Sequence, residues 1–114
     1  MLEKRPVGEN EVQVTFIFVP NGDFNPSLIQ SVHLMGNFKY TTWEDGYEMC
    51  PYKDRWECIL CLPKYKQFEY KIALKIFGHP KKIWVEDAEG DGRAKNAHGT
   101  FNSIVNTGEI YARA

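Results

Sequence analysis

The chain has 114 residues, with 14 Lys and Arg against 15 Asp and Glu, and a formal net charge of −1. This length predicts one domain, over residues 1–114, which can bury a core without metals or disulfides. The near-neutral charge argues against a nucleic-acid binder, and no apolar run reaches the roughly 18 residues that a membrane span needs.

The N-terminal half of the chain predicts short strands separated by turn-rich loops. Apolar residues alternate with mostly polar ones over residues 11–18, which is typical of a half-buried strand. Residues 20–27 are rich in Pro, Asn, Gly and Asp and predict a loop. A second strand is predicted over residues 32–36, ending at a glycine, and a short third strand over residues 47–50.

The C-terminal half continues the same pattern, and its clearest alternation covers residues 68–76. The further predicted strands cover residues 55–62, 82–86, 101–105 and 109–112, with a long polar loop at 87–99. No stretch has the 3.6-residue apolar period of a helix. The sequence therefore predicts an all-β protein, an antiparallel immunoglobulin-like β-sandwich of about seven strands.

The chain has an odd number of cysteines, Cys50, Cys58 and Cys61. Its N-terminal segment lacks the apolar stretch of a signal peptide. Cys58 and Cys61 lie three residues apart on a predicted strand, so their side chains point to opposite faces and do not converge on a metal ion. We therefore expect structural cysteines with reduced thiols, as is typical of a cytoplasmic protein.

The sequence offers little for catalysis. Residues 87–92 resemble the start of a calcium loop, but Glu89 and His98 stand where that pattern requires other ligands, which favours a solvated acidic loop. No nucleophile elbow or glycine-rich phosphate loop is present. We expect no catalytic residue, no metal site, no cofactor and no enzymatic activity.

The chain is 14% aromatic, and strand parity divides these rings into two groups. The rings assigned to the core are Phe16, Phe18, Trp56, Phe68 and Tyr70. Trp43 and Trp84 lie instead among polar residues, where each indole is either exposed or a cap on the end of the sandwich. An exposed indole can pack on the C–H face of a sugar ring while Asn, Thr and Lys bond its hydroxyls, or it can anchor a protein partner.

Several segments, taken in order, resemble a known family. They are Val-His-Leu-Met-Gly-Asn-Phe at 32–38, Trp43, Met49, Trp56, Leu-Pro at 62–63, Phe-Glu-Tyr-Lys at 68–71, Trp84, and Gly-Thr-Phe-Asn-Ser-Ile-Val at 99–105. This series is similar to carbohydrate-binding module family 48, which includes the glycogen-binding domain of the AMP-activated protein kinase β subunit and the N-terminal domains of isoamylases. Family 20 starch-binding domains share most of the pattern. The resemblance covers residues 12–106, the expected core.

The resemblance implies a non-catalytic β-sandwich that binds α-1,4-linked glucans such as glycogen, starch and maltooligosaccharides. It implies that two tryptophans stack on glucose and that a lysine, a threonine and an asparagine bond the hydroxyls. A histidine stands where the family presents a leucine that pierces a curved glucan. The implied site residues are Trp43, Trp84, Lys71, Thr100, Asn102 and His98.

An alternative function stays open beside glucan binding. Trp43 lies two residues later than in the family, the hairpin between Lys71 and Trp84 is longer, and His98 replaces the family's leucine. These departures favour a structural or protein-interaction sandwich, the docking domain of a glucan-metabolising enzyme or kinase, with a degraded sugar site. The expected partner would then be a catalytic domain or subunit.

Overall fold

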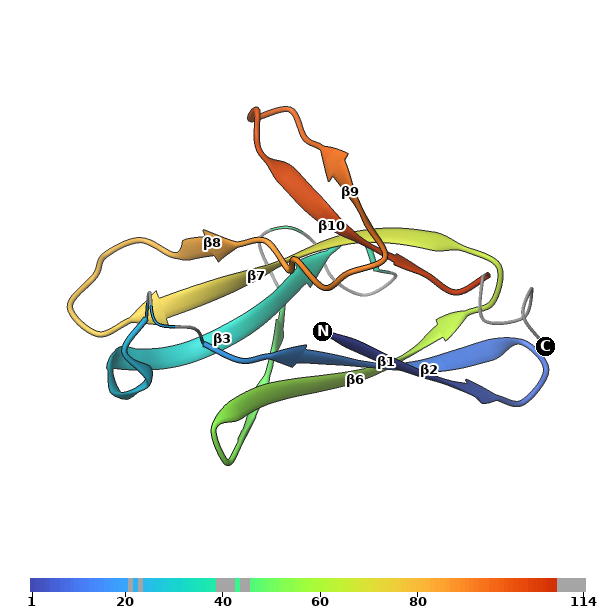
Figure 1. Ribbon diagram of the computed structural model, residues 1–114, viewed down its shortest axis with the longest axis horizontal. Helices are drawn as coiled ribbons and strands as arrows, with labels where there is room; N and C mark the ends of the chain where they lie inside the picture. The colour runs from blue at the N-terminus through green and yellow to red at the C-terminus, as the bar shows by residue number, and fades with distance from the viewer. Residues whose placement is uncertain (21, 23, 39–42, 44–45, 109–114) are drawn as a thin grey trace.

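The computed structural model describes residues 1–108 except 21, 23, 39–42 and 44–45, and these residues form ten strands (Figure 1). The strands are β1 (Leu2–Val7), β2 (Glu11–Phe18), β3 (Ile29–Gly36), β4 (Tyr47–Glu48), β5 (Cys50–Tyr52), β6 (Arg55–Pro63), β7 (Gln67–Ile76), β8 (Ile83–Val85), β9 (Gly92–Lys95) and β10 (Phe101–Asn106). A single 3-10 turn, η1 (Pro26–Leu28), is the one helical element in the described part of the chain.

The strands form two antiparallel sheets that pack as a sandwich. The first sheet has the order β1-β2-β6-β5. The second has the order β4-β3-β7-β10-β9, with β8 also paired to β7. The predicted all-β sandwich is confirmed, and the two sheets appear as two layers (Figure 1).

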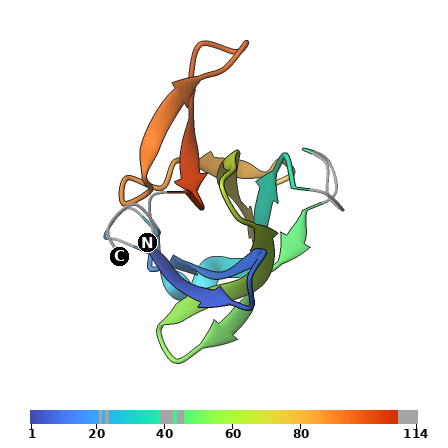
Figure 2. The ribbon, with the colours of Figure 1, turned by 90° about the vertical axis from the view of Figure 1, so that its right-hand side faces the viewer.

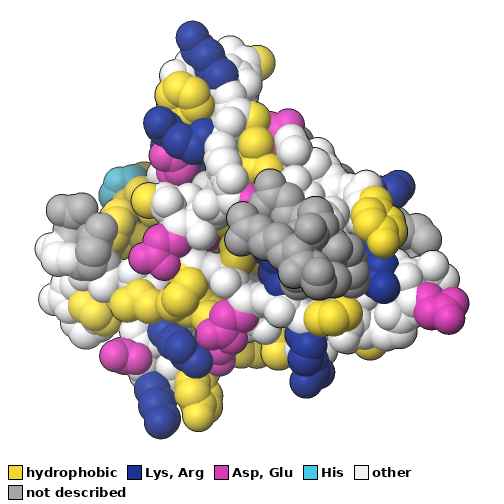
Figure 3. All heavy atoms as spheres, turned by 45° about the vertical axis from the view of Figure 1, so that its right-hand side comes forward, with side chains coloured by type: hydrophobic (Ala, Val, Ile, Leu, Met, Phe, Trp, Pro, Cys, Tyr) yellow, Lys and Arg dark blue, Asp and Glu magenta, His cyan; other side chains and the backbone are white. Residues whose placement is uncertain are grey.

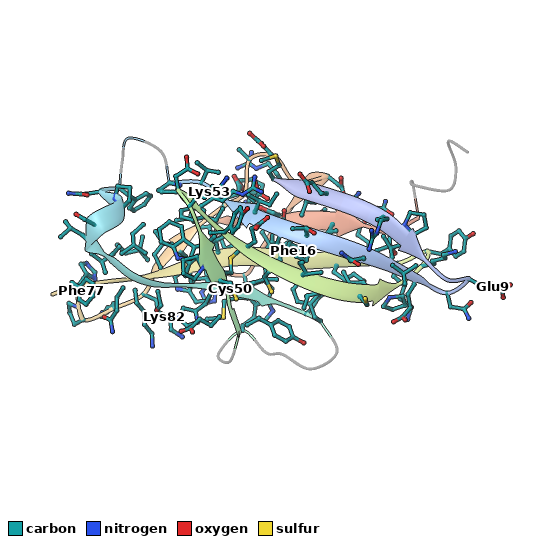
Figure 4. All side chains as sticks on the ribbon, turned by 90° about the horizontal axis from the view of Figure 1, so that it is seen from below. Glu9, Phe16, Cys50, Lys53, Phe77 and Lys82 are labelled. Atoms are coloured by element: carbon teal, nitrogen blue, oxygen red, sulfur yellow. The ribbon has the colours of Figure 1, made fainter. Side chains whose placement is uncertain are left out.

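The core lies between the sheets and is built by the alternation read from the sequence. Phe16 lies near the middle of the molecule, between the ends marked by Glu9 and Phe77 (Figure 4). Its ring meets Tyr70 edge-on, with ring centroids 5.0 Å apart. The predicted core aromatics are either buried (Phe16, Phe18, Tyr70) or partly buried against the core (Trp56, Phe68).

The structure departs from the predicted strands in three places. β1 and β9 lie where no strand is predicted, because both are edge strands with largely polar sequences that give no apolar alternation. The strand predicted over residues 47–50 is wrong as a single element, since the chain passes at Met49 from β4 in the second sheet to β5 in the first. The strand predicted over residues 109–112 lies outside the described residues.

The cysteines differ in their surroundings. Cys58 is half-buried against the core, and burial, followed by the nearby Cys50, raises its pKa to about 11. Cys50 and Cys61 are exposed, so the expectation of simple structural burial holds for Cys58 alone. No cluster of three or more His, Cys, Asp or Glu suited to a metal ion, and no helix long and apolar enough to cross a membrane, occurs among the described residues.

Candidate functional site

A groove of about 600 Å³ lies on the outer face of the second sheet, beside β7, β8 and the β9–β10 hairpin. Its lining residues are Trp43, Lys71, Trp84, Asn96, Ala97, His98, Thr100 and Asn102. All six site residues predicted from the sequence belong to this set. The structure therefore brings together side chains from four separate parts of the chain.

The register of β7 places Lys71 on the outer face of the sheet. Its neighbours Tyr70 and Ile72 point into the core, so Lys71 points outward, as its alternation predicts. It is nevertheless only 9% exposed, because the walls of the groove cover its stem. Trp84 on β8 pairs directly with the small, fully buried Ala73, which puts the indole on the same outer face.

The close approach of the backbone to β3 just before β4 depends on a glycine. Met35 on β3 pairs with Lys71 and is almost fully buried on the outer face. Gly46 lies directly on this methionine, and a Cβ at position 46 would collide with Met35 Sδ and the Leu34 carbonyl oxygen. Glycine at position 46 therefore lets the backbone that leads into β4 lie close against β3. Trp43 is 37% exposed and Trp84 43% exposed.

The turn between β9 and β10 is organised by Asn96 and Gly99. The backbone N–H groups of His98 and Thr100 donate to Asn96 Oδ1, at 3.0 and 3.2 Å. Gly99 has a φ of 81°, the left-handed conformation that glycine adopts without strain. Asn96 and Ala97 line the groove but were not predicted from the sequence. The signal for Asn96 was an asparagine three residues before a glycine in a polar loop.

A line of hydrogen bonds connects the hairpin to β7 along the floor of the groove. Lys71 Nζ donates to Thr100 Oγ1 at 3.0 Å, and Asn96 Nδ2 donates to the same oxygen at 2.8 Å. Asn96 Nδ2 also donates to Asn102 Oδ1 at 3.0 Å, and Asn102 Nδ2 donates to Glu69 Oε1 at 3.0 Å. These bonds fix the polar groups of the groove before any ligand arrives.

The hairpin that forms one wall of the groove projects from the body of the sandwich (Figures 1 and 2). On the hairpin, the Arg93 guanidinium lies 3.9 Å from the centroid of the Phe101 ring. Arg93 Nε also donates to Glu86 Oε2 at 2.8 Å. The space-filling view shows basic and hydrophobic side chains gathered on this projection (Figure 3). The Arg93 contacts with Phe101 and Glu86 brace this wall of the groove.

The arrangement suits a polyhydroxylated ring. Two partly exposed indoles offer flat apolar faces, and amide, hydroxyl and ammonium groups between the sheet and the hairpin offer directed hydrogen bonds. Lys71 and Asn102 hold their positions through bonds to protein groups, so they meet a ligand already oriented. A preorganised polar surface loses less entropy on binding than a mobile one.

No family model and no curated protein matches the chain. Solved structures of the enterobactin esterase FES from Shigella flexneri are similar in fold. The structure with 2,3-dihydroxy-N-benzoyl-serine has a TM-score of 0.68 at 15% identity, covering 93% of this chain and 32% of that one. The structure with enterobactin has a TM-score of 0.65 at 15% identity, with the same coverage. The chain thus spans about a third of the esterase, and the likeness shows a shared sandwich fold alone.

Proposed function

We propose that the protein is a non-catalytic module that binds α-1,4-linked glucan, such as glycogen, starch or maltooligosaccharides. The observation that carries the proposal is that one groove holds both exposed indoles and the hydrogen-bonded Lys71, Thr100 and Asn102. The resemblance to carbohydrate-binding module family 48 supports it independently of the geometry.

In this proposal Trp43 and Trp84 stack on the apolar faces of glucose units. Lys71, Thr100 and Asn102 bond the hydroxyls at the ring edges. Each neutral hydrogen bond contributes only about 0.5–1.5 kcal/mol, so one glucose binds weakly. Affinity rises with chain length until the glucan fills the groove, and then levels off.

His98 lies exposed at the tip of the hairpin and lines the same groove. Its imidazole offers a smaller flat face than an indole, together with a ring nitrogen that can bond a hydroxyl. We assign it to the rim of the site, where it contacts a glucose unit beside the two tryptophans. It takes the place of the leucine found in the family.

A docking function is the second candidate, and two observations favour it. The similar sandwich occupies 32% of a longer esterase chain, so this fold occurs as one part of a larger protein. On β6, Ile59 is 59% exposed, beside the exposed Cys61 two residues later. A catalytic domain or subunit is the partner proposed for this face, which is separate from the groove.

We also propose a cytoplasmic location. Cys50 and Cys61 are exposed free thiols, and exposed thiols persist in a reducing compartment.

The glucan proposal is tested with the double variant Trp43→Ala/Trp84→Ala. Loss of both stacking faces should weaken maltoheptaose binding by about a hundredfold in calorimetric titration and abolish co-sedimentation with glycogen. The matched control is Tyr52→Ala/Phe77→Ala, which removes two rings that are 51% and 59% exposed outside the groove. If wild-type protein stays in solution at the same level as the double variant, glucan binding is wrong.

A further inference from the structure

We propose that Asn96 is a positioning residue that makes its neighbours in the groove donate hydrogen bonds to the ligand. The site then recognises the oxygen lone pairs of the sugar hydroxyls rather than their protons. The inference rests on the proposed glucan binding and adds to it a polarity and a residue that the sequence did not single out.

Asn96 itself has no polar capacity left for a ligand. Its Oδ1 accepts the backbone N–H groups of His98 and Thr100. Its Nδ2 donates to Thr100 Oγ1 at 2.8 Å and to Asn102 Oδ1 at 3.0 Å. Since a side-chain amide has two donors and an oxygen with two lone pairs, all four positions are used. Asn96 therefore acts on the ligand through its neighbours.

The first neighbour, Thr100, is left as a donor. Its Oγ1 accepts from Lys71 Nζ at 3.0 Å and from Asn96 Nδ2 at 2.8 Å, which fills both lone pairs of the hydroxyl. Among the described residues, the hydroxyl proton has one acceptor within hydrogen-bond distance, Asn96 Oδ1 at 3.2 Å, an oxygen that already accepts two N–H groups. This proton is therefore the group that Thr100 offers to a sugar oxygen.

The other two groups add further donors. Lys71 is buried on all but 9% of its surface, and its ammonium has three N–H groups, one of which bonds Thr100. Asn102 gives one N–H to Glu69 and one lone pair to Asn96, which leaves one N–H and one lone pair without a partner among the described residues. Donors thus outnumber acceptors among the three residues that face the groove.

The variant Asn96→Asp separates this role from the role of Asn96 in the turn. A carboxylate accepts the N–H groups of His98 and Thr100 as well as the amide does, so the hairpin is retained. The carboxylate has no N–H to donate. Its second oxygen replaces the Asn96 amide nitrogen, so the Thr100 hydroxyl donates its proton to that oxygen. Thr100 then faces the ligand as an acceptor, and one Asn102 lone pair loses its partner.

The matched control is Asn25→Asp, which adds the same charge to another asparagine turn. Asn25 Oδ1 accepts from the Ser27 backbone N–H at 3.1 Å and from Ser27 Oγ at 2.8 Å, outside the groove. We expect Asn96→Asp to weaken maltoheptaose binding by about tenfold, with an unchanged thermal midpoint, and Asn25→Asp to change neither.

A second measurement reads the polarity directly. Maltotrioses in which single hydroxyls are replaced by fluorine or by hydrogen are titrated into both proteins, because fluorine accepts a hydrogen bond but cannot donate one. In the wild-type protein the fluoro analogue should bind more tightly than the deoxy analogue at the contacted hydroxyl, and Asn96→Asp should remove this difference.

The outcomes are separable. If the wild-type protein binds maltoheptaose and Asn96→Asp binds it with the same affinity, the inference is wrong and glucan binding still holds. The same follows if the fluoro and deoxy analogues lose equal affinity for the wild-type protein. Lost binding together with a lowered thermal midpoint means that Asn96 serves folding alone, and also overturns it. Absence of wild-type binding overturns the glucan proposal and this inference together.

Discussion

Two polar networks lie on opposite faces of the same pair of strands, β7 and β10. On the inner side, Tyr70 OH donates to Asp87 Oδ2 at 2.6 Å, the Asp87 N–H donates to Ser103 Oγ at 2.8 Å, and Ser103 Oγ donates to the Asp87 carbonyl at 3.0 Å. On the outer side, Lys71 and Asn102, the chain neighbours of Tyr70 and Ser103, take part in the groove network.

The two networks differ in how many hydrogen-bonding groups they leave unused. Tyr70 and Ser103 are fully buried and their polar groups are spent within the protein. Lys71 and Asn102 are also buried to about nine-tenths, yet among the described residues Lys71 retains two unused N–H groups and Asn102 one, and both residues line the groove. A closed network stabilises a fold, whereas an equally buried network with unused donors on a cavity is suited to binding. Burial alone would not have told them apart.

The largest expected effect is the loss of stability in Tyr70→Phe. The variant keeps the ring in the core but removes the hydrogen bond to Asp87, a carboxylate whose side chain is only 11% exposed. We expect the free energy of unfolding in urea to fall by about 2 kcal/mol, because hydrogen bonds to charged groups are among the stronger ones. Maltoheptaose affinity should stay unchanged, and a matching loss of affinity would show that the two networks are one.

Alkaline pH should also lower the free energy of unfolding, because the Tyr70 phenol ionises in the unfolded chain well before it does in the folded one. Burial, followed by the charge and hydrogen bond of Asp87, raises the pKa of Tyr70 far above its usual value. In the unfolded chain the phenol ionises near pH 10, so above that pH the unfolded state binds fewer protons than the native state. Stability should therefore fall as pH rises, by up to about 1.4 kcal/mol per pH unit from this group.

The measurement for this pH effect is urea unfolding of the wild type and Tyr70→Phe between about pH 9 and 11. Other titrating groups cancel in the comparison, including Cys58, whose pKa is raised to about 11 in the native state. The stability advantage of the wild type should shrink above pH 10. A constant difference across the range would contradict the inner network as described.

The smallest effect concerns the outer network. Lys71→Met retains an apolar stem of similar length but removes the ammonium, which bonds Thr100 in the described structure. We expect maltoheptaose affinity to fall about fivefold and the free energy of unfolding to change by less than about 0.5 kcal/mol. Calorimetric titration and urea unfolding of the same preparation test both parts. A large loss of stability with intact maltoheptaose binding would show that the outer network serves the fold rather than ligand binding.

The sequence predicted the parts of the fold that depend on alternation. Phe16 and Tyr70 were placed in the core and Lys71 on the outer face, because a half-buried strand repeats every two residues. β1 and β9 were missed, because these edge strands are only partly buried and their charged residues leave no apolar repeat to read.

The site was predicted in its members and not in its geometry. The resemblance supplied the six residues, but their meeting in one groove depends on contacts between distant segments. Gly46 against Met35 is one such contact, and Lys71 with Thr100 is another. Asn96 was overlooked because its importance comes from the groups it occupies on two other side chains, which local sequence does not show.

The projection of the β9–β10 hairpin has a consequence for how such a protein can diversify. β10 pairs with β7 only from Ser103 to Asn106, so the turn that carries Ala97 and His98 extends beyond the ladder that holds the sandwich together. Asn96 and Gly99 frame these two exposed positions and set the turn. Ala97 and His98 can therefore be substituted together without disturbing the two sheets, so ligand preference can change, in evolution or by design, while the fold is kept.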